Sequence, residues 1–415
     1  MNNDHDDVRQ DRRKLLKAGA ALGAAATIGP FFIGNARAAE PLRIGLLLPK
    51  SGSYAVQGAQ GQQGAMLALE DFGGHVNDRP VEVVWYDENG PQTTQQNMHK
   101  LIEEKHVVAV QGGISSGDIL AIMPVAERAS VPLMATGPNA SEITGAQCSK
   151  HTFRVDLPNY TTVRSVYPEL AKHGKNWYFI YASYAWGIDG FNQMKGVLTE
   201  DGGKVVGADK TPLGTTDFSS YILKVMSAEP DALFLGIGGS DLTNFLKQFH
   251  QMGLTDKLPI SALVANDTDL WSAGPAAATG IYPKIWNYAN ADNTQKSNQF
   301  AKTFEEKHGK PPESQAWQDY FGMSALLTAL KQAKSTDGKD MVAFLEQHKF
   351  EGYKERPIYF RSWDHQLIQP TLVASVKKEI PDKYDYFDIA SVQPGASEPL
   401  ESIFPDQQTS ECQLG

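Results

Sequence analysis

Hydrophobic residues between positions 42 and 134 fall in short runs that are separated by amphipathic stretches. The apolar runs at 42–48 (LRIGLLL) and 81–86 (VEVVWY) are typical of buried strands. In residues 58–72 and 93–105 the apolar side chains recur at helical spacing, which predicts a helix after each strand. The pattern continues with strands predicted at 107–110 and 131–134 and a helix at 117–129.

The same alternation starts again after residue 176. Two successive series of strands and helices predict two lobes, each built on a parallel sheet. Sheets of this kind bind ligands beyond the carboxyl ends of their strands. The second series consists of strands predicted at 177–181, 204–208, 232–235 and 260–264 and helices at 187–199, 218–227 and 242–252.

The last third of the chain holds too few elements for a third lobe, with helices predicted at 296–308, 315–333 and 339–347 and one strand at 372–376. We expect this part to complete the first two lobes, with crossovers near residues 153–158, 282–287 and 361–370 that let the lobes hinge. The predicted fold class is α/β, with two Rossmann-like lobes on parallel sheets joined by a three-crossover hinge. The predicted division is 39–155 plus 285–362 for the N-terminal lobe, 156–284 plus 363–390 for the C-terminal lobe, and 391–415 for an irregular tail.

Residues 1–38 have the features of a secretory signal. A basic segment that contains Arg12 and Arg13 precedes an uncharged stretch rich in alanine and glycine, and small residues allow cleavage near Ala38. The arginine pair resembles a twin-arginine signal, although its flanking residues depart from the usual pattern. A transmembrane helix is the alternative, and the four glycines and the proline of residues 18–36 disfavour it. We therefore predict a periplasmic protein.

The chain is acidic, with 38 Lys and Arg against 48 Asp and Glu and a net charge of −10. Removal of residues 1–38 takes away six basic and four acidic side chains, so the net charge deepens to −12. Nucleic-acid and anionic-membrane binding need a surplus of Lys and Arg, so the charge argues against both partners. We expect a soluble protein that is a monomer.

The two cysteines, Cys148 and Cys412, are too few for a disulfide scaffold or a four-thiolate zinc site. In an exported protein they can form one disulfide, which would tie the C-terminal tail to the body. Two unpaired, buried thiols are the alternative.

The turn at 113–117 (GISSG) lies between a predicted strand and a predicted helix and fits the G-x-S-x-G pattern of serine hydrolases. In that case Ser115 is the nucleophile, but no histidine with an acidic partner follows at a suitable strand end. The alternative is anion binding, because a Gly/Ser-rich turn that opens a helix presents free N–H groups and hydroxyls. The next loop, 135–138 (ATGP), has the same properties, and the pair favours a site for one carboxylate.

Other patterns indicate neither a cofactor nor a metal. The segment 236–239 (GIGG) lacks the last glycine of a dinucleotide motif, no phosphate-loop lysine motif is present, and the histidines lack metal-ligand spacing. Tyr181, Tyr184 and Trp186 cluster at the end of a predicted strand. They are candidates either for the core or for covering an apolar ligand.

From residue 43 to about residue 378 the chain resembles the branched-chain amino acid-binding (Leu/Ile/Val) family of periplasmic solute-binding proteins. The resemblance implies two lobes that close around a ligand, no catalysis, and an ABC permease in the inner membrane as the partner. The motifs that carry it are IGLLLPKSGSYAVQG (44–58), the turn at 112–117, VPLMATGP (131–138), YAWG (184–187), PDALFLG (230–236) and WDHQ (363–366).

The resemblance also implies a set of ligand-binding residues. Tyr54 would cover the ligand, and the two loops of the first lobe would hold its carboxylate. The second lobe would contribute aromatic side chains and an acidic partner for an ammonium group. The implied residues are Tyr54, Ser115, Ser116, Ala135, Thr136, Tyr184, Trp186, Ser240, Asp241, Asn266, Asp267 and Tyr320.

The loop 238–240 lacks the aromatic residue that amino-acid binders of the family often carry. The acidic position is ambiguous between Asp241, Asp267 and Asp269. If none of these reaches the cleft, an ammonium group has no counter-ion, and the ligand is a plain carboxylate such as an aromatic acid, or an amide such as urea. The predicted function is therefore hinge-closing binding of a small carboxylate, either an amino acid or an aromatic acid. A ligand-sensing subunit and a serine hydrolase are the alternatives.

Overall fold

The computed structural model describes residues 40–414 of the chain. The predicted signal peptide, residues 1–38, lies outside this range. Within the described part, no helix has the length and apolar character needed to cross a membrane.

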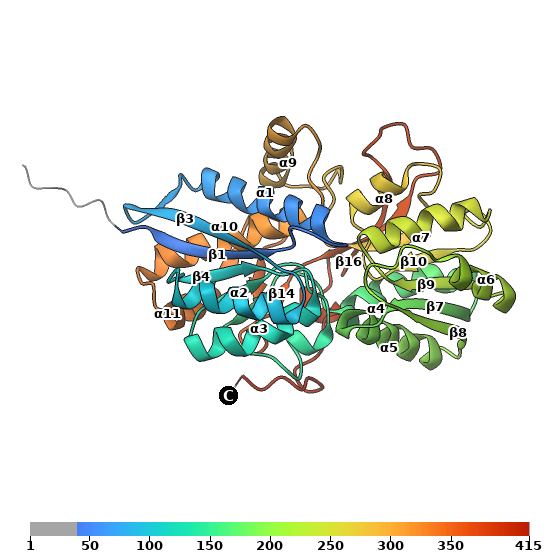
Figure 1. The fold of residues 1–415 in the computed structure, drawn as a ribbon, viewed down its shortest axis with the longest axis horizontal. Coiled ribbons are helices and arrows are strands. Elements are labelled where there is room, and N and C mark those ends of the chain that lie inside the picture. The colour runs from blue at the N-terminus through green and yellow to red at the C-terminus, as the bar shows by residue number, and fades with distance from the viewer. Residues whose placement is uncertain (1–39, 415) are drawn as a thin grey trace, which may run out of the picture. The chain divides into compact units, whose positions relative to one another are not determined.

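The first lobe is built on a six-stranded sheet in which five strands are parallel and the edge strand β2 pairs antiparallel with β3. Alternate residues of β1 point to opposite faces, as in any strand. Ile44 and Leu46 pack with helices α1 and α10, whereas Leu47 packs with α2 and α3. The ribbon of the first lobe and its helices is shown in Figure 1. The sheet order is β2 (His75–Val76), β3 (Arg79–Asp87), β1 (Leu42–Leu48), β4 (Ala109–Gly112), β5 (Leu133–Ala135) and β6 (Thr152–Arg154). The helices are α1 (Ala55–Asp71), α2 (Pro91–Glu103), α3 (Ser116–Ala129), α9 (Gln295–His308), α10 (Ser314–Ala333) and α11 (Gly338–Leu345).

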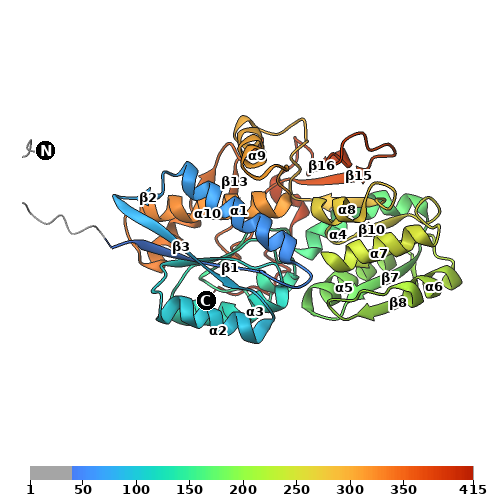
Figure 2. The same cartoon turned by 45° about the horizontal axis from the view of Figure 1, so that its top comes forward.

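The second lobe is built on a seven-stranded sheet with five parallel strands and an antiparallel edge formed by β15 and β16. Helices α4 and α5 cover one face of it, and α6, α7 and α8 cover the other (Figure 2). The sheet order is β16 (Phe387–Gln393), β15 (Thr371–Val376), β11 (Ile281–Lys284), β10 (Ile260–Ala262), β9 (Ala232–Gly236), β7 (Asn176–Ala182) and β8 (Lys204–Thr211). The helices are α4 (Asn159–Leu170), α5 (Ala185–Glu200), α6 (Ser219–Ala228), α7 (Ser240–Gln251) and α8 (Asp267–Ala273).

The chain passes between the lobes three times before it reaches β16. The passages lie between β6 and α4, between β11 and α9, and between β14 and β15. A small antiparallel sheet of β12 (Lys349–Phe350), β13 (Ile358–Phe360) and β14 (Leu367–Ile368) precedes the third passage. The predicted fold class, with two parallel-sheet lobes and three crossovers, is confirmed. Short 3-10 helices occur at η1 (Ser141–Ile143), η2 (Ala171–His173) and η3 (Leu400–Ile403).

Two elements, helix α4 and strand β16, illustrate where the fold differs from the sequence-based expectation. Helix α4 was not predicted, because its sequence NYTTVRSVYPEL carries polar and β-branched residues and a proline. Strand β16 runs to Gln393, so regular structure continues past residue 390, where the irregular tail was predicted to begin. The reason is that β16 pairs antiparallel with β15, and this pairing extends the sheet by one strand.

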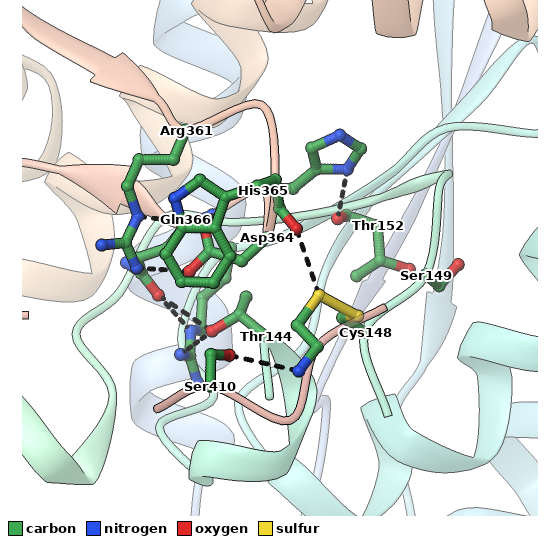
Figure 3. Close-up of a disulfide and its surroundings, with 12 residues drawn as sticks. Thr144, Cys148, Ser149, Thr152, Arg361, Asp364, His365, Gln366 and Ser410 are labelled. Atoms are coloured by element: carbon green, nitrogen blue, oxygen red, sulfur yellow. Dashed lines mark hydrogen bonds and ion pairs between the residues drawn. A yellow bond between two sulfur atoms is a disulfide. The ribbon is translucent and has the colours of Figure 1, made fainter. Parts of the chain in front are cut away.

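The C-terminal tail returns from β16 of the second lobe to the first lobe. Cys412 forms a disulfide with Cys148, which follows η1, so the predicted pairing is confirmed (Figure 3). Leu400 and Phe404 of the tail are buried against Leu157 and Ile368. Residues 394–412 therefore form a fourth connection between the lobes, fixed at its far end by a covalent bond.

Candidate functional site

A cavity lies between the two lobes, where loops follow the carboxyl ends of strands from both sheets. Gly137 follows β5 in the first lobe, and Gly238 and Leu263 follow β9 and β10 in the second. The first turns of helices α10 and α5 also line the cavity, and helix N-termini favour anions. The lining residues are Tyr54, Ile114, Gly137, Asn139, Asp156, Leu157, Thr162, Tyr184, Trp186, Gly238, Leu263, Val264, Ala265, Asn266, Pro283, Lys284, Ile285, Ser314, Gln315 and Gln318.

The lobes contact each other around this cavity, so the structure represents a closed arrangement. The hydroxyl groups of Tyr54 and Tyr184, from opposite lobes, lie 2.6 Å apart. Ser53 Oγ donates to Asp241 Oδ1 at 3.0 Å, and Gln57 Nε2 donates to Asp269 Oδ1 at 2.7 Å. These hydrogen bonds join the start of α1 in the first lobe to α5, α7 and α8 in the second.

Two buried donors on the cavity wall make no hydrogen bond that meets the distance and angle limits among the described residues, although the second of them lies close enough to Asp156 to lower the pKa of its carboxyl group. They are Trp186 Nε1 in the first turn of α5 and Gln318 Nε2 in α10. Trp186 is 6% exposed and Gln318 is 2% exposed, so solvent satisfies neither donor well. An unpaired buried donor costs about 1–3 kcal/mol. The two N–H groups therefore belong to residues on opposite walls of the cavity.

The aromatic cluster predicted from the sequence lies partly on the cavity. Tyr184 and Trp186 line it, with their ring centroids 6.1 Å apart. Tyr181 instead stacks on Phe191 in the core of the second lobe. The cavity wall thus combines aromatic rings with the apolar side chains of Leu263 and Ile285.

Lys284 and Asp267 form an ion pair beside the cavity. Lys284 Nζ lies 2.9 Å from Asp267 Oδ2, and both side chains are 1% exposed. Asn287 Nδ2 donates to the other carboxylate oxygen at 3.0 Å. Asp267, which was a candidate partner for a ligand ammonium, is therefore neutralised by a residue of the chain itself.

Neither Asp241 nor Asp269 lines the cavity. Asp241 Oδ2 accepts from the N–H of Gly214 at 2.9 Å. Asp269 Oδ2 accepts from the N–H of Asn266 at the start of α8, as a helix-capping carboxylate does. Asn266 itself lines the cavity. Ser240 is exposed, and its N–H donates to Ser53 O at 3.0 Å in a contact between the lobes.

Asp156 is a carboxyl group of the cavity that sequence reasoning missed. It lies on the first passage between the lobes, and its Oδ1 accepts from the N–H of Leu157 at 2.7 Å. Burial raises the pKa of Asp156 to about 6, although the nearby amides of Gln318 and Asn139 lower it. A carboxyl group with this environment favours a neutral or cationic neighbour.

The two loops expected to hold a ligand carboxylate are engaged within the protein. The N–H groups of Ile114 and Ser115 donate to the carboxyl group of Glu88. Ser116 Oγ accepts from the N–H of Ala140 at 3.1 Å, and Thr136 Oγ1 donates to Asp319 Oδ1 at 3.0 Å.

Ala135 is the last residue of β5 and is fully buried. Ile114, Gly137 and Asn139, which lie in or next to these two loops, line the cavity, whereas the candidates Ser115, Ser116, Ala135 and Thr136 do not.

Tyr320 lies away from the cavity, in the core of the first lobe. Its hydroxyl donates to Asp71 Oδ2 at 2.8 Å, and its ring lies 4.5 Å from that of Phe300. As a hydrolase candidate, Ser115 has no histidine partner, because no histidine forms a hydrogen bond with it in the part of the chain that the structure describes.

Buried polar side chains form hydrogen bonds where α1, α8 and the start of α10 meet. Glu313, at the start of α10, accepts from the N–H of Thr268 in α8 at 3.3 Å. Burial raises the pKa of Glu313 to about 8 and that of Asp269 to about 7. The closed contact between the lobes therefore holds carboxyl groups whose pKa values are raised by burial.

Sequence reasoning missed Asn139, Asp156, Lys284, Gln315 and Gln318 as lining residues. One signal was available for the two glutamines: α10 is buried along almost its whole length, yet its first turns carry Gln315, Gln318 and Asp319. Polar residues in a fully buried helix need partners. The polar residues at the start of this predicted helix therefore indicated a polar site, which the apolar periodicity of the helix alone did not indicate.

Comparisons with known proteins agree with this architecture. A family model described as "Periplasmic binding protein" matches residues 41–381. The Leu/Ile/Val-binding protein homolog 4 of Brucella melitensis is 27% identical over 394 residues, covering 89% of this chain and 91% of that protein.

Two solved structures match nearly their whole length. The amino acid ABC transporter substrate-binding protein from Pseudomonas fluorescens Pf-5 is 25% identical with a TM-score of 0.81, covering 91% of this chain and 100% of that chain. A solute-binding protein of an ABC transporter from Rhodopseudomonas palustris BisB5, in complex with 3,4-dihydroxybenzoic acid, is 25% identical with a TM-score of 0.78. That match covers 85% of this chain and 97% of that chain.

Proposed function

Because the chain belongs to the periplasmic binding protein family, we propose that it is the solute-binding component of an ABC importer in the periplasm. Its ligand is a small carboxylate with an apolar, aromatic body. The lobes close over this ligand, and the closed form is the one that the permease recognises.

The observation that carries this proposal is the pair of unpartnered donors, Trp186 Nε1 and Gln318 Nε2. They come from opposite lobes, so one acceptor-rich ligand would satisfy both only when the lobes are closed. Hydrogen bonds from N–H groups to a charged acceptor contribute about 1.5–3 kcal/mol each. The ligand thereby stabilises closure, as a hinge-closing binder requires.

The rest of the wall fits an apolar body better than a second charged group. Tyr54, Tyr184 and Trp186 supply aromatic surface, and Leu263 and Ile285 supply aliphatic surface. None of the three acidic residues considered for an ammonium lines the cavity. An aromatic acid therefore fits better than an amino acid, and the relative from Rhodopseudomonas palustris was solved with such an acid.

An amino acid is the second candidate, and Asp156 favours it. Its carboxyl group lines the cavity and would be the counter-ion of an α-ammonium. The two candidates differ in what they require of this residue, because an aromatic acid needs no anion beside it and an amino acid does.

Titration of the mature protein with benzoate, 4-hydroxybenzoate, phenylalanine, leucine and urea tests the proposal. We expect the aromatic acids to bind with a dissociation constant of about 10 μM or lower, and Asp156→Asn to keep this affinity within about 3-fold. Isothermal titration calorimetry measures both. Tight binding of an amino acid that falls by at least about 10-fold in Asp156→Asn would replace the first candidate by the second.

A further inference from the structure

Glu88 follows β3 and places its carboxyl group in the turn that opens helix α3. Ile114 N–H lies 3.0 Å from Glu88 Oε1 and 2.9 Å from Oε2, and Ser115 N–H donates to Oε1 at 2.7 Å. Glu88 is 3% exposed. The carboxyl group of Glu88 thus accepts hydrogen bonds from the N–H groups at the start of α3, which could otherwise bind an external anion.

The space next to this turn is acidic. A second, outer compartment between the lobes is lined by Glu88, Asp118, Ser115 and Leu213, and its lining residues include no Lys, Arg or His. Asp118 Oδ2 accepts from the N–H of Gly90 at 3.0 Å and from Thr94 Oγ1 at 3.1 Å. Burial, and next the charge of Asp118, raise the pKa of Glu88. An additional anion in this compartment meets two carboxyl groups and no cation.

Two tyrosines separate the outer compartment from the inner cavity. Tyr54 and Tyr184 line both spaces, and their hydroxyl oxygens lie 2.6 Å apart. The unpartnered donors Trp186 Nε1 and Gln318 Nε2 belong to residues of the inner cavity alone. The groups that attract an anion and the groups that repel one therefore lie on different sides of the tyrosine pair.

We infer that Glu88 is a specificity-determining residue: its carboxyl group fills the turn at 113–116 and excludes a ligand carboxylate from it. Given the proposed function, the solute carboxylate is then confined to the inner cavity. A solute with a second carboxylate long enough to pass the tyrosine pair is rejected, because that group finds the turn occupied and faces Asp118. Glu88 thus selects short monocarboxylates.

Removal of the Glu88 side chain should open the turn to an external carboxylate. In Glu88→Ala, the N–H groups of Ile114 and Ser115 lose their acceptor, and acetate is small enough to replace it. We expect sodium acetate at pH 6 to raise the melting temperature of Glu88→Ala saturably, by about 2 °C more than sodium chloride of equal ionic strength. The wild type, whose turn is filled, should show no difference between the two salts.

Two variants serve as controls. Glu88→Gln keeps a polar group in the turn and should not respond to acetate. Glu127→Ala removes a carboxylate that accepts from the N–H of His151 at 3.2 Å, outside both compartments, and it should respond to both salts alike. If Glu88→Ala does not fold unaided, its recovery on refolding in acetate is compared with its recovery in chloride, and we expect acetate to give more.

An equal response of Glu88→Ala to the two salts would overturn the inference, and so would an equal acetate effect in Glu127→Ala. The probe is acetate alone, so the outcome does not depend on which solute the protein carries. If the panel of aromatic acids fails while acetate still stabilises Glu88→Ala, the proposed ligand is wrong and the role of Glu88 stands. If the aromatic acids bind while acetate does not specifically stabilise Glu88→Ala, the proposed ligand stands and the role of Glu88 is wrong.

Discussion

Asp267→Asn is expected to lower the free energy of unfolding by about 3–5 kcal/mol. The substitution leaves the ammonium of Lys284 buried without its carboxylate, at a site where both side chains are 1% exposed. Lys284 Nζ then has as neighbours the carbonyl of Ala265, at 3.2 Å, the ring of Phe387, whose centroid lies 4.2 Å away, and at most the neutral amide oxygen that replaces the carboxylate. These neighbours do not replace a full opposite charge. Urea unfolding followed by far-UV circular dichroism measures the loss.

Two further variants separate the charge effect from simple repacking. The double variant Asp267→Asn/Lys284→Met removes both charges and should recover much of the lost stability, because no unpaired ion remains. Glu82→Gln breaks the exposed pair with Arg43 and should cost less than about 1 kcal/mol. A cost for Asp267→Asn no larger than that for Glu82→Gln would show that the buried pair does not support the fold.

Loss of the disulfide is expected to lower the free energy of unfolding by about 2–4 kcal/mol. The bond joins residues 264 apart, so in the oxidised protein it closes a loop of about two thirds of the unfolded chain. Cys412→Ser should reproduce the effect of reductant on the wild type. Leu400 and Phe404 should still hold the tail in part, because they are buried against Leu157 and Ile368.

The control for this experiment is the variant Cys148→Ala/Cys412→Ser, whose stability should not change when reductant is added. A count of free thiols after denaturation without reductant gives an independent check, and we expect none in the wild type. Equal stability of the wild type with and without reductant would mean that the tail contributes nothing to the folded state through this bond.

The fold was largely predictable because its strands are continuous apolar runs and most of its helices are regular in period. The run at 42–48 became β1, and the helix predicted at 315–333 became α10 (Ser314–Ala333). Helix α4 escaped prediction because its stability comes from packing: Val163 and Val166 are fully buried against the second sheet. Tertiary contacts there outweigh weak local propensity.

The site was predictable only in part. Tyr54, Tyr184, Trp186 and Asn266 were predicted, and all four line the cavity. Ser115 was expected to present a free N–H, but Glu88, 27 positions earlier, occupies it. Such a pairing depends on how two neighbouring strand ends meet in space. The spacing of residues along the chain does not predict that the carboxyl group of Glu88 occupies the turn at 113–116.

The proposed function can be tested most directly at the N–H donors of the cavity wall, and first at the indole of Trp186. Trp186→Phe keeps an aromatic ring on the wall and removes the unpartnered indole N–H. Trp271→Phe is the matched control, since that indole donates to Tyr384 O at 2.8 Å and lies outside the cavity.

The decisive measurement is the affinity of both variants for the aromatic acid that the wild type binds most tightly, determined by isothermal titration calorimetry. We expect Trp186→Phe to bind it about 10-fold to 100-fold more weakly and Trp271→Phe to bind it as the wild type does. Unchanged affinity in Trp186→Phe would contradict a carboxylate held by the donors of the inner cavity.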